Sequence, residues 1–101
     1  MRLMVFFDLP TITTEDRRNY RKFRETLIKN GFFMLQESVY CRMLINAAMA
    51  KSVTEKIRNI KPPKGLICAM LVTEKQFAGM EFIIGECTTD VVTTDESLVI
   101  L

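Results

Sequence analysis

The chain has 101 residues, a length typical of one small domain. It carries a formal net charge of +2, contains 49 % hydrophobic residues and has no histidine, which excludes Ser–His–Asp and Cys–His catalytic devices. No apolar run reaches the roughly 18 residues of a membrane span, and the N-terminus lacks a signal-peptide pattern. The three cysteines are widely spaced and form no CxxC pair. We therefore expect a cytoplasmic protein with reduced thiols and no membrane contact.

The charge divides the chain into two parts. Residues 1–64 contain 13 Lys and Arg against 6 Asp and Glu, a balance of +7, whereas residues 65–101 contain 1 against 6, a balance of −5. This asymmetry predicts a basic working surface in the first part and a different role for the acidic second part.

The first predicted strand ends in a carboxylate. Residues 2–7 form an apolar run, and Asp8 follows it directly before the Leu9-Pro10 break. An aspartate in this position is held rigidly at the edge of a sheet and close to water, which suits a metal-binding or acid–base group. A turn-capping aspartate also fits the pattern, so the residues leave both interpretations open. One carboxylate is a poor site for a divalent cation, but two copies of Asp8 across a homodimer axis would hold Mg²⁺ or Mn²⁺ between them.

The first predicted helix covers residues 15–30. Thr13 and Asp16 have capping-box spacing, and Asn30-Gly31 is typical of a helix end. Its apolar stripe consists of Tyr20, Phe23 and Leu27. Its cations occupy an arc of about 160° away from that stripe: Arg17, Arg18, Arg21, Lys22, Arg24 and Lys29. Such a row can follow a phosphate backbone, and a solvated helix face is the alternative.

Two aromatic and branched runs come next, residues 32–40 and 41–45, and they predict one bent strand or a tight pair. Ser38 lies in the first run, where it is either a phosphate donor or an ordinary strand serine. A second helix then begins at an Asn46 cap and ends before Pro62-Pro63. Its apolar face consists of Met49, Val53, Ile57 and Ile60. Residues 66–72 are continuously apolar, which predicts a strand covered on both faces.

The element order β-α-β-β-α-β predicts an α+β, ferredoxin-like core domain over residues 1–75, with one antiparallel sheet and two helices on one face. Residues 76–101 form a C-terminal extension that ends in a short apolar run, 98–101. A lone exposed strand is an aggregation hazard. We therefore expect an extra C-terminal strand that docks on a sheet edge, its own or that of a partner subunit. The high apolar content of so small a chain likewise favours a homodimer.

These features resemble a known family, the small subunit of the CRISPR adaptation complex, a CRISPR-associated endoribonuclease family. The resemblance rests on the opening MRLMVFFDLP, the helix RRNYRKFRETLIKNGF and the stretch QESVY. The segment VTEKQFAGMEFIIGE and the terminal SLVIL resemble the version found in type II systems. The similarity covers essentially the whole chain.

The resemblance implies roles for particular residues. Asp8 matches the metal-binding, proposed catalytic aspartate of a Mg²⁺- or Mn²⁺-dependent nuclease. The family's contacts to nucleic acid fall, in this chain, on six residues: Arg17, Arg18, Arg21, Lys22, Arg24 and Ser38. The end of the chain matches a strand that packs across the homodimer. The implied partners are duplex DNA, RNA as a further nucleic acid, and two dimers of the CRISPR integrase subunit, which hold the small-subunit dimer between them.

Three functions therefore remain open. The first is a non-catalytic DNA-binding scaffold of spacer acquisition, in which the partner performs the phosphoryl transfer. The second is a metal-dependent endonuclease that acts on RNA or DNA through Asp8. The third is a ferredoxin-like toxin RNase, which shares the architecture. The second and third require Asp8, whereas the first does not.

Overall fold

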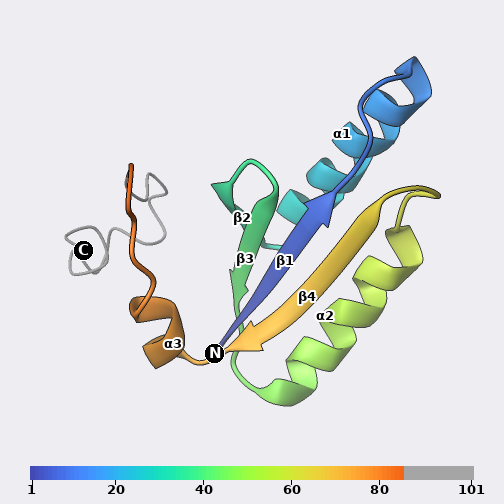
Figure 1. Ribbon diagram of the computed structural model, residues 1–101. Helices are drawn as coiled ribbons and strands as arrows, with labels where there is room; N and C mark the ends of the chain where they lie inside the picture. Colours follow the sequence, from blue (N-terminus) through green and yellow to red (C-terminus); the bar gives the residue numbers. More distant parts are fainter. Residues whose placement is uncertain (86–101) are drawn as a thin grey trace.

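The computed structural model describes residues 1–85, which form a single layered α+β unit (Figure 1). The elements in chain order are β1 (Arg2–Asp8), α1 (Thr14–Lys29), β2 (Phe33–Gln36), β3 (Val39–Met43), α2 (Ala47–Ile60), β4 (Leu66–Val72) and α3 (Glu74–Ala78). The predicted β-α-β-β-α-β order is confirmed. The terminal strand expected at residues 98–101 lies outside the described residues.

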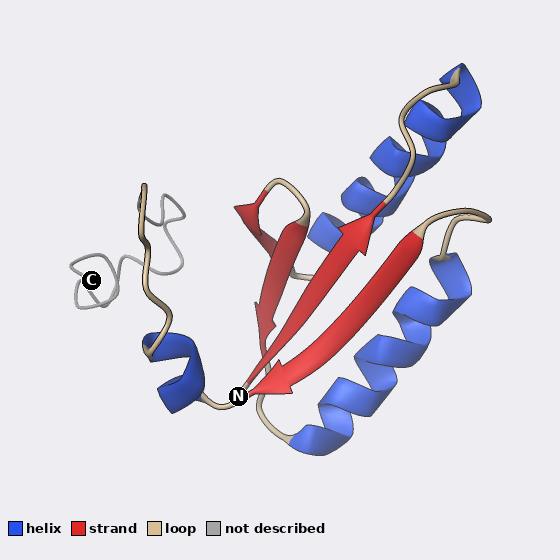
Figure 2. Ribbon diagram, in the orientation of Figure 1, coloured by secondary structure: helices blue, strands red, loops and turns tan. Residues whose placement is uncertain are grey.

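The four strands form one antiparallel sheet in the order β2-β3-β1-β4. β1 is therefore a central strand, and β4 forms one edge of the sheet. Figure 2 shows α1 and α2 alongside the sheet, with α3 set apart from them beyond the end of β4. The ferredoxin-like arrangement predicted from the element order is the observed one.

The helix boundaries follow the capping residues. The Thr13 hydroxyl accepts from the Asp16 N–H at 2.9 Å, and the Asp16 carboxylate accepts from the Thr13 N–H at 3.2 Å. This reciprocal capping box fixes the start of α1. The Asn46 side chain accepts from the Met49 N–H at 2.9 Å and caps α2 in the same way. Both predicted caps are confirmed.

Side chains alternate between two faces of the sheet because successive residues of a strand point to opposite sides. On β1, Leu3, Val5 and Phe7 pack under α1 and α2 in the main core. Met4 and Phe6 point to the other side, called here the open face, where Phe77 of α3 covers part of them. The open face is thus only partly covered by the described residues.

The structure confirms the tight strand pair expected after α1 but corrects the position of its turn. The turn falls at Glu37 and Ser38, so β2 and β3 form a tight pair, and Tyr40 and Cys41 are consecutive residues of β3. Ser38 is therefore a turn residue and not a strand residue. Aromatic and branched residues continue through the turn on both sides, which hides its position from a pattern based on composition.

The predicted bounds of β4 are correct, but the prediction that the strand is covered on both faces is wrong. The strand is apolar from Leu66 to Val72, yet among the described residues most of its side chains are exposed, including Leu66 at 64 % and Met70 at 51 %. Among residues 1–85, the open face of this strand is covered only at its Val72 end, where Phe77 of α3 packs. Exposed apolar side chains gathered on an edge strand are typical of an interaction surface.

Candidate metal and nucleic-acid sites

Asp8 is the last residue of β1, and its side chain is exposed. The alternation along β1 places it on the open face, on the same side as Phe6. It pairs with Leu66 in the β1–β4 ladder, and the preceding N–H, that of Phe7, donates to the Ser38 carbonyl at 3.1 Å. The carboxylate is thus held at a rigid strand end while it stays accessible to water, as predicted.

Gly65 supports this strand end, and the sequence reasoning missed it. Its φ of +103° lies in the region that favours glycine. A Cβ at this position would lie 2.7 Å from the Asp8 carbonyl oxygen and 2.6 Å from the Leu9 side chain. The signal in the sequence is a glycine between the Pro62-Pro63 helix stop and an apolar strand. Only glycine lets the chain enter β4 this close to Asp8.

We expect Gly65→Ala to lower the free energy of unfolding by about 1–3 kcal/mol, since it adds both a disfavoured φ and a clash with backbone. Urea unfolding measures this change. Gly79→Ala is the matched control, because Gly79 has a φ of −79° and a Cβ there meets nothing closer than 3.5 Å. A destabilisation by Gly65→Ala no larger than that of the control would contradict the role assigned to Gly65.

Residues 1–85 of one copy do not supply a complete metal site. Within residues 1–85, no group of three or more Asp, Glu or Cys side chains lies close enough to hold an ion. Hard divalent cations take six or more oxygen ligands. Asp8 offers an exposed carboxylate on an open face, so among residues 1–85 it fits a metal where further oxygen ligands, such as a second Asp8 and water, complete the set.

The structure divides the predicted nucleic-acid contact residues of α1 into two groups. Arg17 donates to the carbonyls of Thr11 and Ile12 at 3.2 and 2.9 Å, and so braces the loop before the helix. Arg24 donates through Nε to the Tyr40 hydroxyl at 2.8 Å. These two arginines therefore have structural partners of their own.

The other predicted contact residues of α1 are free of such partners. Arg18, Arg21 and Lys22 are exposed, and none of them forms a hydrogen bond through its side chain or an ion pair with another residue of the described part of the chain. Exposed cations without ion pairs on a helix are available to neutralise backbone phosphates. The part of the predicted arc that remains available for phosphate binding therefore consists of Arg18 and Arg21 in its middle and Lys22 at its end.

Tyr20 lies beside the turn that contains Ser38. Its hydroxyl donates to the Glu37 carbonyl at 3.4 Å. Burial raises the pKa of Tyr20, the nearby Glu37 carboxylate raises it further, and a hydrogen bond with Ser38 acts in the opposite direction. Ser38 is exposed and lies at the same end of the sheet as Asp8, but its hydroxyl has Tyr20 as a hydrogen-bond partner.

Tyr40 is fully buried at the centre of the main core, and Phe7 lies against it with ring centroids 5.6 Å apart. The hydrogen bond to its hydroxyl raises the pKa of the Arg24 guanidinium above its usual value. The hydroxyl of the buried Tyr40 therefore has a hydrogen-bond partner, Arg24 of α1.

We expect Tyr40→Phe to change the free energy of unfolding by about 1 kcal/mol or less. The ring stays packed, and the guanidinium of the exposed Arg24 recovers its hydrogen bond from water. Tyr40→Ala removes the ring and should cost about 3–5 kcal/mol, as truncation of a large buried side chain does. Thermal unfolding of both variants measures the difference. Equal effects of the two variants would mean that the hydroxyl, and not the ring, stabilises this site.

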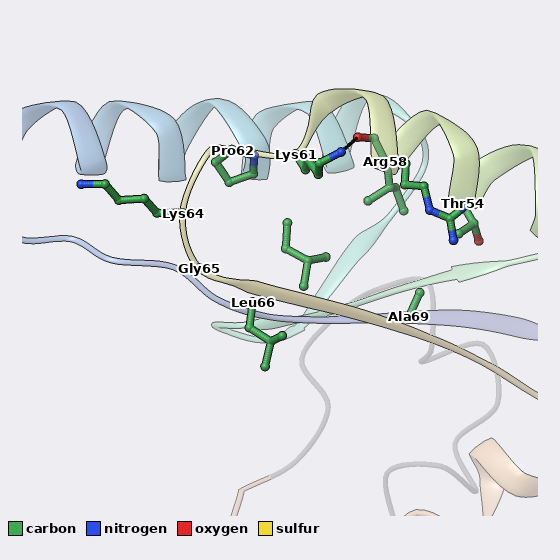
Figure 3. A pocket seen from close by; sticks show the side chains of 10 residues that line it. Thr54, Arg58, Lys61, Pro62, Lys64, Gly65, Leu66 and Ala69 are labelled. Carbon is green, nitrogen blue, oxygen red and sulfur yellow. Dashed lines mark hydrogen bonds between the residues drawn. The ribbon is translucent and has the colours of Figure 1, made fainter.

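A cavity of about 410 Å³ lies between α2 and β4 (Figure 3). Its cations largely have partners within the chain: Arg58 pairs with Glu55, and Lys64 lies 3.9 Å from Asp16. Figure 3 shows Lys64 extending away from the cavity toward α1, and Leu66 pointing to the opposite side of β4. This cavity is therefore less suited to an anion than its composition suggests.

The fold assigns the chain to the ferredoxin-like α+β domains, with one sheet face covered by helices and the other open. Comparisons with known proteins then identify the family within this fold class. Residues 1–80 match the family described as CRISPR associated protein Cas2. The chain is 52 % identical to the CRISPR-associated endoribonuclease Cas2 of Treponema denticola and 43 % identical to that of Ligilactobacillus salivarius, each over 100 % of both chains. The chain belongs to the Cas2 family of CRISPR-associated proteins, as the resemblance indicated.

A solved structure agrees with this assignment. The crystal structure of Streptococcus pyogenes Cas2 at pH 6.5 aligns with a TM-score of 0.65 and 19 % identity, over 82 % of this chain and 99 % of that chain. At this identity the likeness supports the fold alone. Within residues 1–85, no helix is both long and apolar enough to span a membrane.

Proposed function

We propose that the chain is a homodimeric, nucleic-acid-binding subunit of the CRISPR spacer acquisition complex, which bridges two integrase dimers and binds the backbone of duplex DNA. The observation that carries this proposal is the row of exposed cations on α1 without partners among residues 1–85: Arg18, Arg21 and Lys22. Membership of a CRISPR-associated family supports the biological setting. In the described part of the chain no aromatic stacking platform accompanies the row, so contacts to phosphate, and not to bases, are expected.

The homodimer part of the proposal is supported by the open face. Leu66, Cys68 and Met70 alternate along β4 with their side chains on this face and exposed. Apolar side chains gathered on one face and left bare favour burial against a second copy. Asp8 lies on the same face at the same end as Leu66, so packing of two open faces would bring the two Asp8 carboxylates toward a common axis. In this proposal the C-terminal extension, residues 76–101, completes the dimer with its terminal strand, and the assembly works in the cytoplasm.

The test of the proposal is salt-dependent binding to scrambled duplexes. We expect Arg18→Gln combined with Arg21→Gln to lower the slope of log K against log[salt] by about 0.9 for each phosphate that the variant no longer binds. Arg17→Gln is the matched control, since Arg17 binds loop carbonyls. A double variant that binds with unchanged affinity and slope would remove α1 from the binding surface. A strong preference for one sequence would contradict backbone recognition.

A second candidate function is a divalent-metal-dependent endonuclease acting on RNA or DNA. It is favoured by the exposed strand-end carboxylate of Asp8, and the relatives of Treponema and Ligilactobacillus are named endoribonucleases. In this function the two Asp8 copies of the dimer would hold Mg²⁺ or Mn²⁺, which would supply an activated water and charge neutralisation. The role of Asp8 is to hold the cation, and that of the α1 cations and Ser38 is to position the phosphodiester.

A further inference from the structure

A groove of about 320 Å³ lies between α1 and the end of α2, on the covered side of the sheet. Its α1 wall is formed by residues spaced three and four apart, and therefore on one helix face: Asn19, Lys22, Phe23 and Thr26. Its other wall is the last turn of α2 and the residues that follow: Asn59, Ile60, Lys61, Pro62 and Pro63. The groove is separate from the Asp8 strand end and from the open face.

Among residues 1–85, the lining contains two lysines, one from each wall, and no carboxylate. Lys22 has no ion pair within residues 1–85, and the Lys61 ammonium donates to the Arg58 carbonyl at 3.3 Å, which leaves two of its three N–H groups free. Two like charges on facing walls repel, and a groove focuses their field outward. The C-terminal end of α2 contributes about half a negative charge, which two full positive charges outweigh. An anion between the lysines would relieve the repulsion.

Neutral donors stand beside the two lysines. The side-chain amides of Asn19 and Asn59 form no hydrogen bond with any other group in residues 1–85. Each amide offers two N–H donors. Donors and cations from both helices therefore line one groove, which suits an anion with several oxygens, such as a phosphate.

We propose that the groove is a phosphate subsite, in which Lys22 and Lys61 together hold one backbone phosphate of the bound nucleic acid. The proposal rests on the proposed function, because the basic arc of α1 ends at Lys22 and a backbone that follows the arc runs directly to the groove. A nucleic acid is favoured over an acidic peptide because the lysines continue a row of free cations, Arg18 and Arg21, along the same helix. The surface that binds the duplex thus includes residues of α2 as well as α1.

The test is a double-mutant cycle with Lys22→Gln and Lys61→Gln, titrated against a scrambled duplex at several salt concentrations. Each single variant is expected to weaken binding by about fivefold, the effect of removing one exposed charge. If both lysines hold one phosphate, the double variant lowers the slope of log K against log[salt] by about 0.9, whereas two independent phosphates would give about 1.8. A decrease near 1.8, or no decrease, overturns the shared subsite.

Lys56→Gln is the matched control, since Lys56 is an exposed lysine of α2 that lines none of the cavities described for residues 1–85. Lys56→Gln should leave the slope of log K against log[salt] unchanged. An effect equal to that of Lys61→Gln would mean that the loss of any positive charge on α2 weakens binding, and would contradict the subsite. In a second measurement, inorganic phosphate should shift the side-chain amide NMR signals of Asn19 and Asn59 in the wild type and not in the double variant. Absence of these shifts in the wild type counts against the subsite.

The outcome separates this proposal from the function on which it rests. If the Arg18/Arg21 double variant loses duplex binding while the groove variants keep it, α1 binds nucleic acid and the subsite is wrong. If the wild type binds no duplex, the proposed function fails and the subsite fails with it.

Discussion

Asp8→Asn is expected to lower Mg²⁺- or Mn²⁺-dependent cleavage by the purified protein by orders of magnitude. The amide keeps the shape of the side chain but loses the charge that holds the cation, and metal-assisted hydrolysis then loses its activated water. The side chain is exposed at the end of β1, so the substitution should leave folding unchanged. Cleavage of labelled RNA and DNA, with and without EDTA, measures the effect.

The same variant separates the two proposed functions. A scaffold needs the shape of the dimer and its basic surface, and not the carboxylate. Asp8→Asn should therefore still dimerise, bind duplex and support spacer acquisition in cells. Glu37→Gln is the control, because it removes one exposed carboxylate from the neighbouring turn. A normally folded Asp8→Asn protein that abolishes acquisition would contradict the scaffold, and one that cleaves at the wild-type rate would contradict the nuclease.

Met70→Lys is expected to raise the dissociation constant of the homodimer by about a hundredfold or more. Met70 is 51 % exposed on the open face, so a lysine is tolerated in the single chain. In the dimer, each copy would bury an unpaired ammonium, at a cost of several kcal/mol per ion. Sedimentation equilibrium over a range of concentrations measures the change.

Met34→Lys is the control for this experiment. Met34 is 43 % exposed, but it pairs with Tyr40 and so lies on the helix-covered side of β2. The same substitution there should leave the dimer intact. A wild-type chain that sediments as a monomer at micromolar concentration would contradict the proposed homodimer. Equal effects of the two lysines would place the interface elsewhere.

Much of the fold was accessible from the sequence, including the position of Asp8 at the end of a strand. The Thr13 and Asn46 caps, the apolar stripes and the strand that ends in Asp8 all follow from interactions between residues a few positions apart. Short-range rules therefore predict α1 and α2 to within a residue, because capping and periodicity are local properties of the chain. The sequence analysis did not predict α3, although Thr73 and Gln76 form a capping box at its start. The resemblance to a CRISPR-associated family was confirmed by the comparisons.

The tertiary structure decided which of the predicted residues are free to act. Helical spacing places six cations on one arc, but it cannot reveal that Arg24 faces the Tyr40 hydroxyl or that Arg17 braces the preceding loop. These interactions join segments whose proximity depends on the whole fold.

The same reason applies to β4 and to Gly65. A continuous apolar run looks alike in a buried strand and in an edge strand, and only the order β2-β3-β1-β4 shows that β4 lies at an edge with its open face bare. The closeness of Gly65 to the Asp8 carbonyl likewise depends on the pairing of β4 with β1. Local chemistry determines the elements and their caps, whereas exposure and long-range contacts arise only when the sheet is assembled.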